Sequence, residues 1–327
     1  MRFALRRLGF FALTLWAALS LNFLLPRVMP GNPVESAIAS LHVPLTPAEM
    51  NAIAAQFGIN QHQGLVSEYF TYLGHTLTGN LGVSFVHYPT PVTSYIATGM
   101  WWTLGLVGTA TILAFILGTA VGAIAAWRRG SRLDSTLPPL LVFTTAIPYF
   151  WVGLMLILVF SSVLGWLPSQ GGYTLGATPT LSLSFIGDVL QHAILPAFAL
   201  LITSIGGWVL TMRNTMVGTL TEDYVRMARA KGLPPHRIMM SYAARNAILP
   251  NLTGFAMSLG FVVSGAILVE YVFNYPGVGF MLFNAVNGSD YPLMQGLFLL
   301  ITVVVLLCIV LSDIATAILD PRTRTAA

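Results

Sequence analysis

Long apolar runs recur along the 327 residues and alternate with polar segments. An apolar run of about 20 residues can cross the roughly 30 Å hydrocarbon core of a bilayer as an α-helix. The runs that satisfy this length lie at residues 8–28, 102–127, 137–164, 192–212, 252–273 and 293–318. The pattern therefore predicts an all-α integral membrane protein with about six transmembrane helices.

The composition agrees with a membrane protein. Apolar residues make up 56% of the chain and charged residues only 8%, whereas soluble domains are about one quarter charged. The single cysteine, Cys308, excludes an internal disulfide. The basic residues are dispersed and form no stripe with interleaved aromatics, so we expect lipid, and no nucleic acid, as the partner of this surface.

The basic residues occur in alternate connecting segments. They comprise Arg2, Arg6 and Arg7, then Arg128, Arg129 and Arg132, then Arg213, Arg226, Arg229, Lys231, Arg237 and Arg245, and finally Arg322 and Arg324. The segments 29–101, 165–191 and 274–292 contain none. By the positive-inside rule, both termini are predicted to be cytoplasmic in a multi-pass protein of the plasma or inner membrane. Arg27 breaks this pattern, and we expect it to snorkel to the headgroups.

The outer segment 29–101 is too long for a simple connector. Thr46 to Glu49 has the pattern of a capping box. A second helix is predicted over 65–77, where Leu65, Tyr69, Tyr72 and Leu73 recur at helical spacing. This segment could serve as a lid that packs on the membrane surface or as a docking platform for an extracytoplasmic partner. Its histidines lack the spacing of metal ligands on one helix face; they are His42, His62, His75 and His87.

Within the third run, Pro148 removes a backbone donor and predicts a kink. We expect a neighbouring helix to satisfy the carbonyl that loses its partner. Polar residues within the runs are candidates to face a pathway, namely Thr144, Thr145, Ser258 and Ser264.

Motifs of enzymes are absent from the sequence. There is no H-E-x-x-H, no G-x-S-x-G and no phosphate-binding P-loop. The only lysine, Lys231, follows Ala230, whereas a P-loop lysine follows glycine. We therefore expect no enzyme activity in this chain, and another chain would have to hydrolyse ATP if transport uses it.

The inner segment between the fourth and fifth runs predicts a short surface helix. Glu222 and Asp223 suit a helix N-terminus, and Gly232 followed by Pro234 suits its end. The residues between them mix small and basic side chains and include Tyr224, Arg226, Ala228, Arg229, Ala230 and Lys231. An amphipathic helix held by anionic lipid is one interpretation.

A family resemblance offers a sharper interpretation. Short motifs occur in order along nearly the whole chain: Arg6-Arg7-Leu8, Pro30-Gly31-Asn32-Pro33, Phe57-Gly58-Ile59, Gly79-Asn80-Leu81-Gly82-Val83-Ser84, Pro91-Val92, Pro148-Tyr149-Phe150-Trp151, Leu195-Pro196-Ala197, Asp223-Tyr224-Val225-Arg226, Ala228-Arg229-Ala230-Lys231-Gly232-Leu233, Arg245-Asn246-Ala247-Ile248-Leu249-Pro250, Glu270-Tyr271-Val272-Phe273, Tyr275-Pro276-Gly277-Val278-Gly279, Asp290-Tyr291-Pro292 and Asp320-Pro321-Arg322. Together they resemble the permeases of binding-protein-dependent ABC importers, in the dipeptide, oligopeptide and nickel family and of its first permease type. The usual Glu-Ala-Ala triplet is Arg226-Met227-Ala228 here, and an arginine at its first position is common in the peptide branch.

The resemblance implies a heteromeric importer of dipeptides or oligopeptides. Its other parts would be a second related permease, two cytoplasmic ATPase subunits or domains that use ATP and magnesium, and an extracytoplasmic solute-binding protein; this chain would bind no cofactor. The residues from Glu222 to Gly232 would form the coupling helix that contacts the ATPase. Gly232 would permit the backbone to approach the ATPase closely, and the small side chain of Ala228 would add little bulk to that face of the helix. Nickel, glutathione or oligosaccharides remain alternative solutes. A stand-alone secondary transporter and a membrane-embedded enzyme remain alternative classes of protein.

This interpretation divides the chain into four parts. They are the N-terminus with the first helix (1–28), the outer loop (29–101), the permease core (102–319) with its coupling loop (213–250), and a cytoplasmic tail (320–327). Charges near helix ends are candidates for contacts between helices. Asp313 is predicted to pair with Arg213 or Arg245, and Glu270 is expected to have a structural partner.

Overall fold

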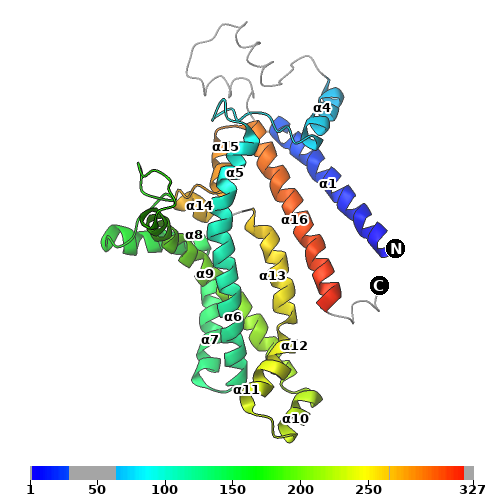
Figure 1. The fold of residues 1–327 in the computed structure, drawn as a ribbon, viewed down its shortest axis with the longest axis vertical. Helices are drawn as coiled ribbons and strands as arrows, with labels where there is room; N and C mark the ends of the chain where they lie inside the picture. The colour runs from blue at the N-terminus through cyan, green and yellow to red at the C-terminus, as the bar shows by residue number, and fades with distance from the viewer. Residues whose placement is uncertain (1, 29–63, 265, 320–327) are drawn as a thin grey trace. The chain divides into compact units, whose positions relative to one another are not determined.

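The computed structural model describes residues 2–28, 64–264 and 266–319 (Figure 1). Regular structure in these ranges is helical, apart from one isolated bridge between Val83 and Pro91. The α-helices are α1 (Arg2–Val28), α4 (Leu65–Leu77), α5 (Val92–Thr103), α6 (Thr109–Trp127), α7 (Arg132–Ala146), α8 (Tyr149–Leu156), α9 (Leu183–Thr219), α10 (Asp223–Ala230), α11 (Pro235–Arg237), α12 (Arg245–Ala247), α13 (Leu249–Val262), α14 (Ile267–Val272), α15 (Val278–Asn287) and α16 (Tyr291–Leu319). Three π-helical segments adjoin them: Leu104–Gly108, Ile157–Val163 and Ile238–Ala244.

Several helices have the length and composition of membrane spans. Val92–Trp127, Leu183–Thr219 and Tyr291–Leu311 each qualify alone, and α7 qualifies together with α8. The described residues thus contain three such helices, or four with the bent pair, in keeping with an all-helical integral membrane protein. The apolar parts of α1 and α13 are shorter. The helix predicted from residue 102 begins at Val92, and the helix predicted over 192–212 extends in both directions.

Pro148 divides the third predicted span. Helix α7 ends at Ala146, α8 begins at Tyr149, and the two are bent by 91°. The predicted kink is confirmed, but the prediction about the freed carbonyl is wrong. Pro148 has no N–H to donate to the carbonyl of Thr144, four residues earlier. The Ile147 N–H donates to this carbonyl instead, at 3.3 Å, so the local backbone satisfies it.

The chain divides into two compact units. The first comprises residues 1–102 and 276–306, and the second comprises 103–275 and 307–327. In the first unit, α4 packs on α1: Tyr69 Oη lies 2.7 Å from Ser20 Oγ, and Asn22 Nδ2 donates to Tyr72 Oη at 3.2 Å. The helix predicted over 65–77 is confirmed, and Leu65 at its start is exposed.

Arg27 also contributes to the contact between α1 and α4. Its guanidinium forms an ion pair with Glu68 of α4 and lies 3.5 Å from the centroid of the Phe23 ring. Its neighbours in this unit are therefore a carboxylate and an aromatic ring, and its contact with lipid headgroups stays a prediction. The capping box at Thr46 to Glu49 lies outside the described residues.

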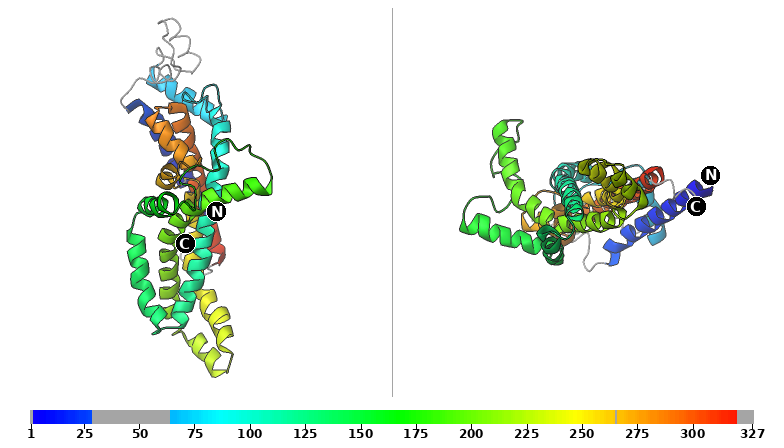
Figure 2. Two further views of the ribbon diagram at one scale, coloured as in Figure 1. Left: turned by 90° about the vertical axis from the view of Figure 1, so that its left-hand side faces the viewer. Right: turned by 90° about the horizontal axis from the view of Figure 1, so that it is seen from below.

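In the second unit, α6, α7 and α9 run alongside one another (Figures 1 and 2). Two glycines on α6 face α9. A Cβ on Gly118 would lie 2.6 Å from Cβ of Trp208, and a Cβ on Gly122 would lie 2.5 Å from the carbonyl oxygen of Val209. Small residues at this spacing allow helix backbones to approach closely in membranes. The sequence contains this G-x-x-x-G signal at Gly118 and Gly122.

Candidate coupling site

Helix α10 forms where the sequence predicts a short surface helix. Glu222 precedes it in extended conformation, and the acidic Asp223 occupies its first turn. A negative charge there interacts favourably with the positive end of the helix dipole. At the other end, Gly232 has φ +72° and donates its N–H to the carbonyl of Arg229 at 3.0 Å. The predicted helix is therefore confirmed.

Gly232 is required by the backbone conformation of this turn. A φ of +72° is the left-handed region, which glycine adopts without the strain that a Cβ introduces. A Cβ at this position would meet no atom of the described residues within 4 Å. Packing against the part of the chain that the structure describes therefore gives no reason for glycine here, and the expected close approach to a partner remains a prediction.

One face of α10 packs against the following helical segment. Val225 is completely buried and Ala228 is 2% exposed, and both belong to one apolar cluster with Ile238. Ala228 thus lets α10 approach the segment Ile238–Ala244. Ala228 was predicted to face the ATPase, where its small side chain would allow close approach. In the structure it faces the segment Ile238–Ala244 of the same chain instead.

The opposite face of α10 is open and mixes apolar with basic side chains. Met227 is 59% and Tyr224 38% exposed. The other exposed residues of this segment are Glu222, Asp223, Arg226, Arg229, Ala230 and Lys231. Arg226 lies 3.7 Å from Asp223, but both side chains are well exposed, so this pair contributes little to stability. We call Tyr224, Arg226, Met227, Arg229 and Lys231 the outer strip.

Apolar packing connects α10 to the helix bundle. Trp127 and Leu220 contact the cluster around Val225. The same two side chains contact a second cluster that includes Met212 and Met216 of α9. Since packed side chains resist deformation, a displacement of α10 would be transmitted to the ends of α6 and α9.

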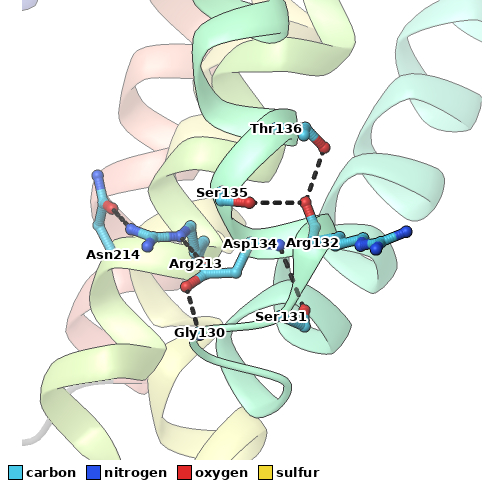
Figure 3. A network of polar contacts seen from close by, with 8 residues as sticks. All are labelled: Gly130, Ser131, Arg132, Asp134, Ser135, Thr136, Arg213 and Asn214. Atoms are coloured by element: carbon cyan, nitrogen blue, oxygen red, sulfur yellow. Dashed lines mark hydrogen bonds and ion pairs between the residues drawn. The ribbon is translucent and has the colours of Figure 1, made fainter.

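An ion pair joins α7 to α9 near this end of the bundle (Figure 3). Nε of Arg213 donates to Oδ1 of Asp134 at 2.6 Å, and Oδ2 of Asp134 accepts from the Gly130 N–H at 2.9 Å. Nη1 of Arg213 also donates to Oδ1 of Asn214 at 3.0 Å. The side chain of Asp134 is 9% and that of Arg213 22% exposed, so the pair is largely shielded from water.

Asp134 is not the partner that the sequence predicted for Arg213. The side chain of Asp313 lies outside the described part of the chain, so its pairing with Arg213 or Arg245 stays a prediction. Arg245 is exposed at the start of α12. Asp134 was missed, although it is the one carboxylate next to the basic cluster Arg128–Arg132 in the sequence.

Two other carboxylates are completely buried. Glu270 accepts a hydrogen bond from Oγ1 of Thr103 at 2.8 Å. Burial, and secondarily the charge of Glu270, raise the pKa of Tyr275 to about 12, so this phenol stays protonated at neutral pH. In the first unit, Asp290 accepts from Oγ of Ser84 and caps the start of α16 by accepting from the Leu293 N–H at 3.2 Å. The structural partner expected for Glu270 is therefore present, whereas the role of Asp290 was not predicted.

The described residues contain no group of three or more His, Cys, Asp or Glu side chains that could hold a metal ion. His42 and His62 lie outside the described ranges. His87 contacts two hydroxyls: its Nε2 lies 3.0 Å from Oη of Tyr95 and its Nδ1 3.3 Å from Oγ of Ser84.

Comparison with known proteins identifies the family. Residues 118–325 match the model of the binding-protein-dependent transport system inner membrane component. The chain is 37% identical, over 99% of both chains, to a protein of Brucella suis biovar 1 named as a peptide permease. It is 33% identical to the oligopeptide transport system permease protein AppB of Bacillus subtilis over 92% of both chains, and 32% identical to the dipeptide transport system permease protein DppB of Escherichia coli K12 over 99% of both. The chain therefore belongs to the family of inner-membrane components of binding-protein-dependent transport systems.

Proposed function

We propose that this chain is a permease subunit of an ABC importer and forms half of a pathway for dipeptides or oligopeptides. The names of its relatives support peptides as the solute, because AppB and DppB are named as oligopeptide and dipeptide permeases. A solute-binding protein would deliver the peptide from outside, and a second related permease would complete the pathway. Two cytoplasmic ATPase subunits or domains would bind ATP and magnesium, and this chain would bind neither.

In this proposal the chain crosses the membrane six times with both termini in the cytoplasm. Besides the helices of sufficient length, α1 would be the first span, and α13 with α14 the fifth. The distribution of basic residues supports this arrangement, because Arg and Lys are excluded from 165–191 and 274–292 and gather in 213–250.

Cysteine labelling tests the orientation. Ser67 on α4 and Thr221 before α10 are both exposed, so a cysteine at either position is open to reagents. In a background with Cys308→Ala, Ser67→Cys should react with a membrane-impermeant maleimide in intact cells. Thr221→Cys should react only after the membrane is permeabilised. The reverse pattern would contradict the proposed topology.

The outer strip of α10 would be the ATPase contact. The observation that supports this role is an exposed apolar side chain, Met227, surrounded by basic residues on a helix whose other face is fixed by Val225 and Ala228. Exposed apolar side chains inside a polar rim are typical of protein interfaces. The packing through Trp127 and Leu220 would carry movement of α10 into α6 and α9.

Substitution of Met227 tests this contact. Met227→Glu should lower peptide uptake and peptide-stimulated ATP hydrolysis by about tenfold or more, since a central interface residue contributes about 1–2 kcal/mol or more. Membrane insertion should be unchanged, because the side chain is exposed. Leu175→Glu is the matched control: Leu175 is 95% exposed in a segment predicted to lie outside the cell. Equal uptake by the two variants would exclude Met227 from the ATPase contact.

A further inference from the structure

A cavity of about 390 Å³ lies within the second unit, where the break between α7 and α8 faces α6 and α9. The residues of the break, including Pro148 and Tyr149, form one wall. Thr111 of α6 contributes to the lining, as do Thr203 and Ser204 of α9. This volume is within the range of about 300–1,000 Å³ that small-molecule sites occupy.

The position of the cavity follows from the helix packing. At Gly206, α9 touches α7 so closely that a Cβ would lie 2.6 Å from Cγ2 of Thr145. Beyond this contact α7 ends at Ala146, and α8 turns away by 91°, so the space beside α9 is not filled by a continuing helix. Non-helical backbone at membrane depth is tolerated where it lines a cavity, and interrupted spans often mark transport sites.

The polar lining consists mainly of hydroxyls that are already oriented. Each donates to a carbonyl of its own helix: Thr111 to Val107 at 2.7 Å, Thr145 to Val142 at 2.9 Å, Thr203 to Ala199 at 2.9 Å and Ser204 to Leu200 at 2.6 Å. A hydroxyl that donates in this way presents its oxygen lone pairs to an incoming donor. The lining therefore offers acceptors to N–H groups.

Within the described part of the chain, no charged side chain lines this cavity. A carboxylate or an ammonium group in the lining would favour ligands of opposite charge and exclude those of like charge. Hydroxyl acceptors instead suit a group that every peptide possesses, the backbone N–H. Neutral hydrogen bonds are also individually weak, and a transport site must release its solute as well as hold it.

We propose that this cavity is a contact site for the peptide in transit, where the hydroxyls of Thr111, Thr145, Thr203 and Ser204 accept hydrogen bonds from peptide N–H groups without discriminating side-chain charge. This inference rests on the proposed function. It adds the location of the contact and the chemical basis of its broad selectivity.

Charged substitutions at Ser204 test the inference, because this residue is small and exposed to the cavity. The complete transporter is reconstituted in proteoliposomes, and uptake of alanyl-lysine, dialanine and alanyl-glutamate is measured. Ser204→Asp should raise the ratio of alanyl-lysine to alanyl-glutamate uptake by about tenfold over the wild-type ratio, and Ser204→Lys should lower it by about tenfold. Thr211→Asp and Thr211→Lys are controls on the same helix outside the lining, and their ratios should match that of the wild type.

A second variant, Thr203→Val, removes an acceptor while preserving the side-chain shape. It should lower uptake of all three peptides by about 3- to 10-fold and leave the ratio of alanyl-lysine to alanyl-glutamate uptake unchanged. Unchanged ratios in both Ser204 variants, together with full uptake by Thr203→Val, would overturn the contact site while leaving the importer function intact. Failure of the wild-type transporter to import any of the peptides would instead refute the proposed function, and the inference with it.

Discussion

Replacement of Gly122 by leucine is expected to abolish the folded permease. A Cβ at this position would lie 2.5 Å from the carbonyl oxygen of Val209, 2.9 Å from Cβ of Met212 and 3.2 Å from the backbone nitrogen of Arg213. Two of these atoms belong to the backbone of α9 and cannot rotate away. Overpacking of a filled core costs about 1–3 kcal/mol, and more where the backbone must move, so α6 and α9 should separate.

Thermal unfolding and size-exclusion chromatography in detergent will measure this effect. Gly122→Leu should reduce the monodisperse fraction to near zero, and the milder Gly122→Ala should lower the Tm. Gly105→Leu provides the control, because a Cβ on Gly105 in the same long helix would meet no described residue within 4 Å. If Gly122→Leu matches Gly105→Leu in yield and Tm, the two helices do not pack through this glycine.

Removal of the Arg213 guanidinium is expected to impair transport strongly. Arg213→Ala leaves the carboxylate of Asp134, which is 9% exposed, without its cationic partner. The cost should lie between the roughly 1 kcal/mol of an exposed pair and the roughly 3–5 kcal/mol of a buried pair that loses one member. We expect peptide uptake to fall by tenfold or more, because α7 loses this ionic contact with α9 while the packing at Gly206 remains.

A charge exchange distinguishes the pair from a general loss of packing. Asp134→Arg combined with Arg213→Asp should recover part of the uptake that either single substitution removes. Recovery should be incomplete, because the Gly130 N–H loses its carboxylate acceptor. Arg226→Ala is a control for thermal stability alone, because its contact with Asp223 is exposed and Arg226 belongs to the outer strip; its effect on the Tm should be small. Strictly additive effects in the exchange would show that the two charges do not interact functionally.

These sites lie along one continuous helix. Helix α9 contributes Thr203 and Ser204 to the cavity, Gly206 to the contact with α7, and Arg213 to the ion pair. It ends at Thr219, shortly before α10. A helix of 37 residues that packs on both α6 and α7 is a physical route by which a movement of α10 can reach the cavity, and the substitutions above measure whether coupling uses it.

The sequence by itself determined the class of protein and the ends of helix α10. Apolar runs mark membrane helices because lipid replaces water as their solvent. The boundaries of α10 could be predicted because capping depends on residues only a few positions apart: Glu222 and Asp223 at its start, and Gly232 after its end. The break at Pro148 is equally local, because it follows from one missing N–H.

Only the tertiary structure decided which distant groups meet. Arg213 pairs with Asp134 across 79 positions of sequence, and the carboxylate proposed from sequence proximity to a helix end was a different one, Asp313. The inward direction of Ala228 and the acceptor-lined cavity beside Thr203 likewise depend on how helices pack. Periodicity tells which residues share a helix face, but the partner of that face is chosen by close packing and charge pairing between segments that are far apart in the chain.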